Sequence, residues 1–147
     1  MQNKIEEFLK HHVPIVNLRL GPNWNECHYQ KLLNHILNKH GYKTSIELPK
    51  EVFISFEGEV VNIGNRRFDI VVHADSEEEE DIIIECKAMV GPATELNKKQ
   101  LLHYLELNKT RIGFLVKFFS YGGYSVNSDS KEEDNCKNKC QVIKIVS

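Results

Sequence analysis

The chain has 147 residues, of which 41% are hydrophobic and 27% charged, and its formal net charge is −2. This length allows one domain with a hydrophobic core that needs no covalent cross-links, and the composition is that of a globular protein. No run approaches the roughly 18 to 20 consecutive apolar residues of a membrane span, and the amphipathic start MQNKIEEFLKHH differs from a secretory signal. We therefore expect a soluble, intracellular protein without membrane contact that forms a single domain over residues 1–147.

Charge and cysteine content exclude few functions. Six acidic residues, Asp75 and the run 77–81, are expected in a solvated turn, which leaves 19 basic against 15 acidic residues elsewhere. The four cysteines are too few and too scattered for a disulfide framework. Cys136 and Cys140 have C-x3-C spacing but lack a second pair of zinc ligands, and the seven histidines show no ligand spacing with them. We expect free thiols.

The first predicted elements are two helices. Apolar side chains at helical spacing over residues 5–12 predict a short helix that ends before Pro14. A second helix is expected to start after a Gly-Pro break with Asn23 as its cap. Its apolar residues follow the i, i+3, i+4, i+7 pattern until Gly41 supplies a left-handed stop.

Strands follow the second helix. Pro49 and a turn at 57–59 separate three segments that are rich in β-branched and aromatic residues, namely 44–48, 52–56 and 62–74. After the acidic turn, the apolar run at 81–89 is typical of a central strand covered on both faces.

The last elements complete an alternating pattern. Residues 94–107 predict a helix and residues 112–119 a buried strand. The polar stretch 121–139 is expected to be a loop that precedes an edge strand at 141–146. This order predicts an α/β sandwich with a central mixed β-sheet flanked by helices.

Three ionisable residues, Asp69, Glu85 and Lys87, interrupt apolar strand sequence. Side chains alternate along a strand, so Glu85 and Lys87 share a face, and a hairpin through the acidic turn would bring Asp69 beside Glu85. Charged groups on an interior face are costly unless they are paired or bound to a metal. Two carboxylates with an adjacent ammonium fit a hard-cation site. A buried ion network of Asp69 and Glu85 with Lys87 or Arg67 fits the same pattern.

Glu26 is a candidate third carboxylate. It lies three residues before Tyr29 and seven before Leu33, which places it on the core-facing side of the second helix. Alternatively, Glu26 closes a capping box with Asn23. The pattern leaves both interpretations open.

These residues belong to a longer series of motifs. Asp69 followed by Glu85-Cys-Lys87 resembles the D-(x)n-(D/E)-x-K signature of the PD-(D/E)XK nuclease superfamily. The segment LGPNWNECHY (20–29) is similar to the L-G-P-G-x-x-E-x-x-Y opening of the small GxxExxY proteins of that superfamily. Their R-x-D, E-L-K, Q-L-x-x-Y-L and G-L-L-I-N-F motifs are matched, in this order, by RFD (67–69), ECK (85–87), QLLHYL (100–105) and IGFLVKF (112–118).

The resemblance implies a restriction-endonuclease-like sandwich with an α-β-β-β-α-β core at about residues 13–119 and a C-terminal extension at 120–147. It further implies a metal-dependent nuclease that hydrolyses phosphodiester bonds of DNA (or RNA), with Mg²⁺ or Mn²⁺ as the cofactor. The expected partner is nucleic acid, DNA rather than RNA. Because no second domain for target recognition is evident, specificity would come from a homodimer or a targeting partner protein.

The resemblance also implies roles for single residues. Glu26, Asp69 and Glu85 would bind the metal ion. Asp69, Glu85 and Lys87 would form the catalytic set, in which Lys87 positions or polarises the attacking water and stabilises charge on the phosphate.

Three further residues would support the reaction. Gln100 and Tyr104, one helical turn apart on one face, would orient Lys87 or touch the substrate backbone, although Tyr104 also fits a core position. Arg67 would contact phosphate or pair with a ligand carboxylate. The alternative function is a catalytically inactive nucleic-acid- or protein-binding module that retains the nuclease fold.

Overall fold

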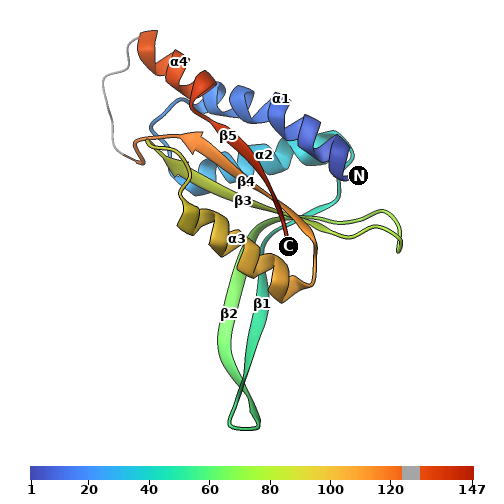
Figure 1. Cartoon of the computed structure of the whole chain (residues 1–147). Helices are drawn as coiled ribbons and strands as arrows, with labels where there is room; N and C mark the ends of the chain where they lie inside the picture. The colour runs from blue at the N-terminus through green and yellow to red at the C-terminus, as the bar shows by residue number, and fades with distance from the viewer. Residues whose placement is uncertain (124–129) are drawn as a thin grey trace.

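In a computed structural model, the chain forms a five-stranded mixed sheet in the order β1-β2-β3-β4-β5, in which only β3 and β4 pair in parallel (Figure 1). The structure describes residues 1–123 and 130–147. The helices in these residues are α1 (Gln2–Leu20), α2 (Glu26–Lys39), α3 (Glu95–Asn108) and α4 (Ser130–Asn138). The strands are β1 (Thr44–Phe56), β2 (Glu59–Val72), β3 (Ile82–Met89), β4 (Ile112–Phe119) and β5 (Gln141–Val146).

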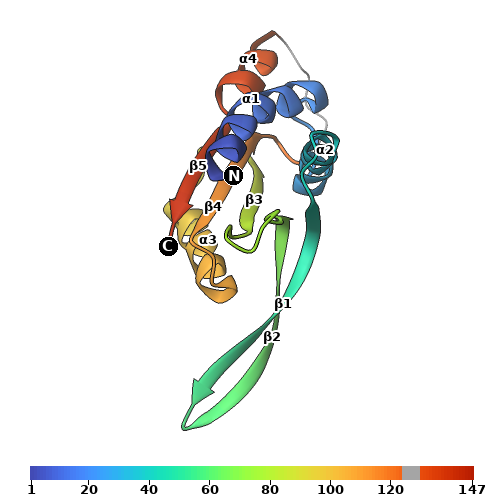
Figure 2. The same cartoon turned by 90° about the vertical axis from the view of Figure 1, so that its right-hand side faces the viewer.

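Helices cover both faces of the sheet (Figure 2). One hydrophobic core lies between the sheet and α1 with α2, and a smaller core lies between the sheet and α3. Along β3, Ile82 and Ile84 pack into the first core and Ile83 into the second, as the pleat of a strand requires. The predicted α/β sandwich with a doubly covered central strand is therefore confirmed.

The first helix continues through Pro14, so the prediction that it ends before this residue was wrong. A proline inside a helix costs about 3 kcal/mol. Apolar side chains at helical spacing continue beyond it, and Val13 and Val16 are fully buried, which outweighs that cost at about 1.5–3 kcal/mol per side chain. Asn17, also fully buried, donates to the Phe119 carbonyl (3.0 Å) and accepts from its N–H (2.7 Å), which fixes α1 to the end of β4.

The second helix begins at Glu26 with Asn25 as its N-cap, so the prediction that Asn23 caps it was wrong. The preceding segment is held in an extended connection by Ser120, whose hydroxyl donates to the Trp24 carbonyl at 2.6 Å. The Asn23 Oδ1 atom is buried without a hydrogen-bond partner in the described part of the chain. A capping box between Asn23 and Glu26 is therefore not formed.

Two of the predicted strands form one strand, β1, because Pro49 does not interrupt it. Proline is tolerated in an edge strand, and β1 lies at the edge of the sheet. A β-bulge between Glu51 and Phe53 is the irregularity in its pairing with β2. Since β2 pairs with β3 only over Ile70–Val72, the outer parts of β1 and β2 project from the body as a two-stranded ribbon (Figure 1). We call residues 50–66 of this ribbon the arm.

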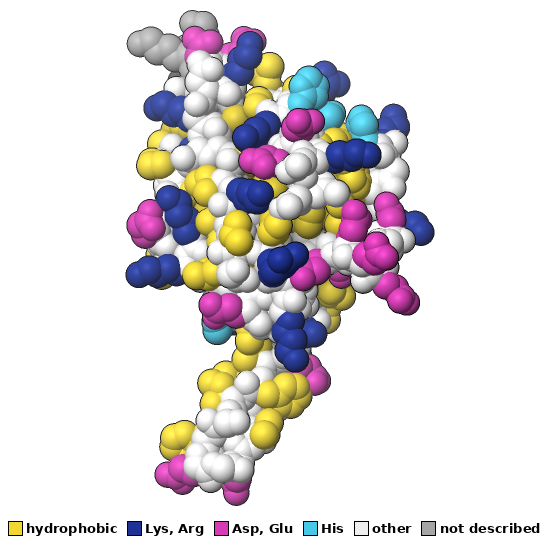
Figure 3. Space-filling view, turned by 45° about the vertical axis from the view of Figure 1, so that its right-hand side comes forward, with side chains coloured by type: hydrophobic (Ala, Val, Ile, Leu, Met, Phe, Trp, Pro, Cys, Tyr) yellow, Lys and Arg dark blue, Asp and Glu magenta, His cyan; other side chains and the backbone are white. Residues whose placement is uncertain are grey.

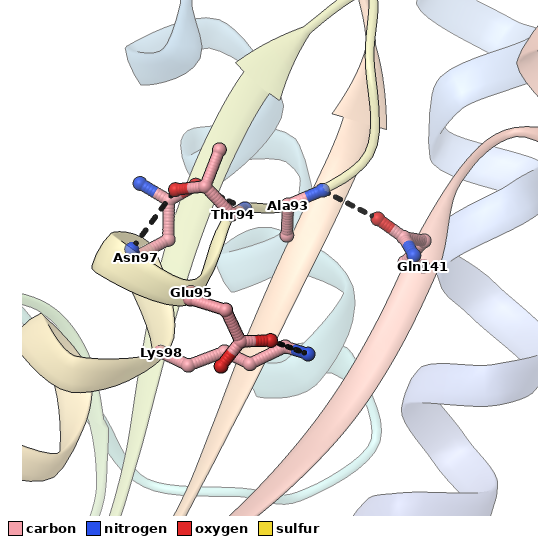
Figure 4. Close-up of polar contacts among 6 residues, drawn as sticks. All are labelled: Ala93, Thr94, Glu95, Asn97, Lys98 and Gln141. Atoms are coloured by element: carbon pink, nitrogen blue, oxygen red, sulfur yellow. Dashed lines mark hydrogen bonds and ion pairs between the residues drawn. The ribbon is translucent and has the colours of Figure 1, made fainter.

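The start of α3 is fixed by a capping box (Figure 4). The Thr94 hydroxyl accepts from the Asn97 N–H at 3.1 Å, and the Asn97 side chain accepts from the Thr94 N–H at 2.9 Å. The Ala93 N–H donates to Gln141 Oε1 at 2.7 Å, which links the start of α3 to β5.

Gly113 in β4 allows α3 to pack closely on the sheet. A Cβ atom at this position would lie 2.9 Å from Leu105 Cδ2 and 3.0 Å from the Ile83 carbonyl oxygen. The first distance is shorter than real Cβ contacts and the second is tighter than nine in ten of them, so a larger residue would require Leu105 and the β3 backbone to shift.

Of the remaining predictions for the fold, most were confirmed and one was wrong. Gly41 has φ of 90° and follows α2 as the predicted stop, and β4 and β5 have the predicted limits. The predicted loop at 121–139 was wrong for residues 130–138, which form α4 with Cys136 buried against the body; residues 124–129 lie outside the described residues. The four cysteines are free, as expected. None of the helices in the described residues is long and apolar enough to cross a membrane.

Candidate active site

The site lies where β2 separates from β3 after three residue pairs. Beyond these pairs, alternate N–H groups of β3 face the side that β2 has left. Carboxylates occupy it: the Cys86 N–H donates to Asp69 Oδ2 at 2.8 Å, and the Ala88 N–H donates to Glu26 Oε1 at 3.2 Å. Side chains from β2 and α2 thus replace a neighbouring strand along this part of β3.

Glu85 directly precedes Cys86 on β3 and is only 5% exposed. Its Oε2 atom is buried without a hydrogen-bond partner in the described residues. Burial, followed by the negative charge of Asp69, raises the pKa of Glu85 to about 10, while Lys87 acts in the opposite direction. Burial also raises the pKa of Glu26, again opposed by Lys87. The structure therefore brings Glu26, Asp69, Glu85 and Lys87 into one electrostatic cluster.

The other three candidates lie apart from this cluster. Arg67 is exposed, and its Nη1 atom lies 3.9 Å from Glu47 Oε2. Tyr104 is buried beside Phe68 with ring centroids 5.6 Å apart, which is the core position left open by the sequence. Gln100 is half-buried one turn earlier on α3. Among the described contacts, no hydrogen bond joins these three side chains to the carboxylates.

One positioning residue was missed from the sequence. Gln30 is 4% exposed and its Nε2 atom donates to the backbone carbonyl of Asp69 at 3.2 Å. It lies four residues after Glu26, so both side chains leave the same face of α2. That spacing was the available signal, because a buried polar residue one turn after a candidate ligand is expected to have a partner at the same site.

The donor set fits a hard divalent cation, which prefers oxygen ligands. Glu85 has a buried oxygen without a partner, and the crowded carboxylates would be stabilised by positive charge. As the side chains stand in the described residues, no three His, Cys, Asp or Glu groups are arranged to hold an ion. Glu26 and Asp69 each direct one oxygen to a β3 N–H. Asp69 and Glu85 are the residues that would hold an ion, with Glu26 as the third carboxylate.

A family model described as PD-(D/E)XK nuclease superfamily matches residues 3–127. The chain belongs to this superfamily. The crystal structure of SSO0001 shares its fold with a TM-score of 0.55 and 21% identity, over 80% of this chain and 48% of SSO0001. The chain thus spans about half the length of SSO0001. No protein of curated function shows significant sequence similarity to it.

Membership confirms the predicted restriction-endonuclease-like sandwich, and the superfamily to which the chain belongs is one of nucleases. The residues predicted to form its signature, Asp69, Glu85 and Lys87, lie at the separation of β2 from β3. The narrower resemblance to the GxxExxY proteins stays a prediction.

Proposed function

We propose that this PD-(D/E)XK protein is a metal-dependent nuclease that hydrolyses phosphodiester bonds of DNA, or of RNA. The observation that carries the proposal is the buried Glu85 carboxylate with one oxygen lacking a partner, surrounded by Asp69, Glu26 and Lys87. A protein that needed only stability would gain by replacing such a cluster with apolar residues. Its position at an opening in the sheet supports a role in binding an ion and a substrate.

The protein groups would act as follows. Asp69 is held at its side chain by the Cys86 N–H and at its backbone by Gln30, so it would need little rearrangement to bind an ion together with Glu85. When bound, Mg²⁺ or Mn²⁺ supplies a Lewis acid that lowers the pKa of water and screens the phosphate. Lys87, two residues after Glu85 on the same face of β3, would orient the attacking water and stabilise negative charge on the phosphate.

Three other residues would contribute outside this cluster. Arg67 is exposed and, in the described residues, its side chain forms a 3.9 Å ion pair with Glu47, an interaction weak enough in water to be exchanged for a phosphate. Gln100 and Tyr104, which lie on α3, would orient Lys87 or contact the substrate backbone. Nucleic acid, DNA rather than RNA, is the proposed partner.

Metal binding tests the proposal before any substrate is known. Calorimetric titration of Mn²⁺ should show binding to the wild type and to Asp75→Asn, a control that removes an exposed carboxylate from the acidic turn. The same titration should show no binding to Asp69→Asn.

A cleavage assay tests the role of Lys87. Lys87→Ala should keep the metal affinity but lose at least roughly 100-fold in cleavage rate, since Lys87 would act on transition-state charge. Equal cleavage by Lys87→Ala would refute its role.

The competing function is a catalytically inactive nucleic-acid- or protein-binding module. The observation that favours it is that no three ligand side chains in the described residues are arranged around a common ion. If Mn²⁺ binds neither the wild type nor Asp69→Asn, with or without DNA, the nuclease proposal fails and the binding module stands.

A further inference from the structure

The arm exposes many large hydrophobic side chains. Figure 3 shows them along the projecting ribbon, with acidic groups at its tip and both basic and acidic groups near its root. Those exposed by more than two fifths are Phe53 (54%), Ile54 (47%), Phe56 (66%), Val60 (71%), Val61 (41%) and Ile63 (58%). A contiguous apolar patch of this kind is rare on a monomer, and an isolated two-stranded ribbon is marginally stable in water.

Both faces of the arm are apolar. Ile54 lies opposite Val61 in the register, so they share one face, which also carries Phe56 two residues further along. Phe53 and Val60 occupy the other face. In addition, the two strands of the arm have outer edges whose backbone groups can pair with another strand. In the described part of the chain, no other element covers the outer part of the arm.

Charge separates the two ends of the arm. The tip carries Glu57 and Glu59, and the root carries Lys50 and Arg66, which face each other across the ribbon, next to Glu51. All five side chains are exposed, so the tip has a net charge of −2 and the root one of 2 − 1 = +1. An acidic tip would be repelled by the phosphates of a nucleic-acid groove. It would be attracted by the basic root of another arm.

We propose that the arm pairs with the arm of a second copy of this chain, in an antiparallel, two-fold arrangement that places each tip on the partner's root. Such an isologous contact is self-complementary, because tip meets root at both ends. The four hydrophobic residues of one face, Ile54, Phe56, Val61 and Ile63, expose roughly 300–400 Å² on each copy, at about 150–200 Å² for a whole side chain. Polar groups at the tip and root add to this, and a stable interface needs about 800 Å² per partner.

The root offers a place for the partner's tip. A hollow of about 340 Å³ lies between the arm and α3, lined in part by Val52, Ile63, His103 and Leu107. In the antiparallel arrangement the Phe56 side chain of the other copy, the most exposed aromatic of the arm, would reach this end. The lining also includes the polar side chains of Asn65 and Arg66. An aromatic side chain that fills a hollow of the partner is typical of an interface hot spot.

Light scattering across the micromolar range tests the pairing on the full chain. The wild type should be a dimer, and Phe56→Asp should reduce the measured mass by half. Leu96→Asp is the matched control, because Leu96 is 75% exposed on α3 and lies outside the arm; it should remain a dimer. A wild type that is monomeric throughout would overturn the proposal. Circular dichroism of Phe56→Asp verifies that the body still folds.

Charge reversal tests the antiparallel orientation. Glu57→Lys with Glu59→Lys makes tip and root basic, and Lys50→Glu with Arg66→Glu makes both acidic, so each double variant alone should be monomeric. A mixture of the two should form a heterodimer, since both of its tip–root contacts are attractive. Failure of the mixture to associate would overturn the antiparallel arrangement.

The proposal does not rest on the proposed nuclease function, and it excludes a role of the arm as a nucleic-acid wedge. A monomeric wild type whose affinity for duplex DNA falls in Phe56→Asp, but not in Leu96→Asp, would overturn the dimer in favour of that wedge.

Discussion

Replacing Glu85 by glutamine should stabilise the metal-free protein although it removes a proposed ligand. Burial and the charge of Asp69 raise the pKa of Glu85 to about 10 from an ordinary value of 4.5. Between these values the folded state holds a proton that the unfolded state releases, so the free energy of unfolding falls as the pH rises. Each pH unit costs about 1.4 kcal/mol. From about pH 5.5 to about pH 7.5, the wild type should therefore lose up to about 3 kcal/mol that Glu85→Gln retains.

Urea unfolding in the presence of a chelator, at both pH values, measures this difference. Ionisable groups outside the Glu85 cluster contribute equally to both proteins, so the informative quantity is the difference between the wild type and Glu85→Gln at each pH. Asp75→Asn, which removes an exposed carboxylate, should follow the wild type. Parallel pH profiles of the wild type and Glu85→Gln would refute the reasoning, because Glu85 would then not be a buried carboxyl among like charges. Such a gain in stability with loss of function is common at functional sites.

Three further substitutions test the packing that holds the site. Asn17→Ala should destabilise the protein by roughly 2–4 kcal/mol in chemical denaturation, since both backbone groups of Phe119 lose their buried partner; a loss below about 0.5 kcal/mol would contradict this. Gly113→Ala should cost roughly 1–3 kcal/mol through contact with Leu105, and an unchanged melting temperature would contradict it. Thr94→Ala should cost about 1 kcal/mol and speed amide exchange in the first turn of α3, and unaltered exchange would refute the cap.

The sequence was informative where one local pattern and burial agree. The helix after Gly21, the central strand at β3 and the buried strand at β4 have strong periodicity or long apolar runs, and each was predicted close to its observed limits. The errors at Pro14 and Pro49 both arise because the tertiary context outweighs the local effect of proline. Each proline is locally unfavourable, but α1 gains burial on both sides of Pro14 and β1 is an edge strand that needs no N–H at Pro49.

The helix α4 could not be predicted from periodicity. Cys136 is its one buried hydrophobic side chain in the described residues, so the segment shows no apolar stripe. Its helical state depends on packing against α1, which is distant in sequence. A tertiary contact of this kind leaves no local signal.

The candidate site was predicted in part. Costly charges within apolar strands identified Asp69, Glu85 and Lys87 as candidates, and in the structure the charges of Asp69 and Lys87 act on Glu85. Arg67 is exposed and pairs with Glu47 at the surface, a contact that the sequence pattern did not reveal. The backbone partners of Asp69 and Glu26 were invisible from sequence, since they depend on where β2 leaves β3.

The separation of β2 from β3 links the candidate site to the arm. If the two strands paired along their full length, β3 would have no free N–H groups, Asp69 would have no gap to fill, and the arm would be an interior part of the sheet. Because the pairing stops after three residues, the free N–H groups of β3 bind carboxylates. The outer parts of β1 and β2 form a ribbon with exposed edges and apolar faces. Pairing of two arms would therefore stabilise β2 where it carries Asp69. Dimerisation and metal affinity should accordingly be coupled, so that Phe56→Asp, far from the carboxylates in sequence, weakens Mn²⁺ binding while Leu96→Asp leaves it unchanged.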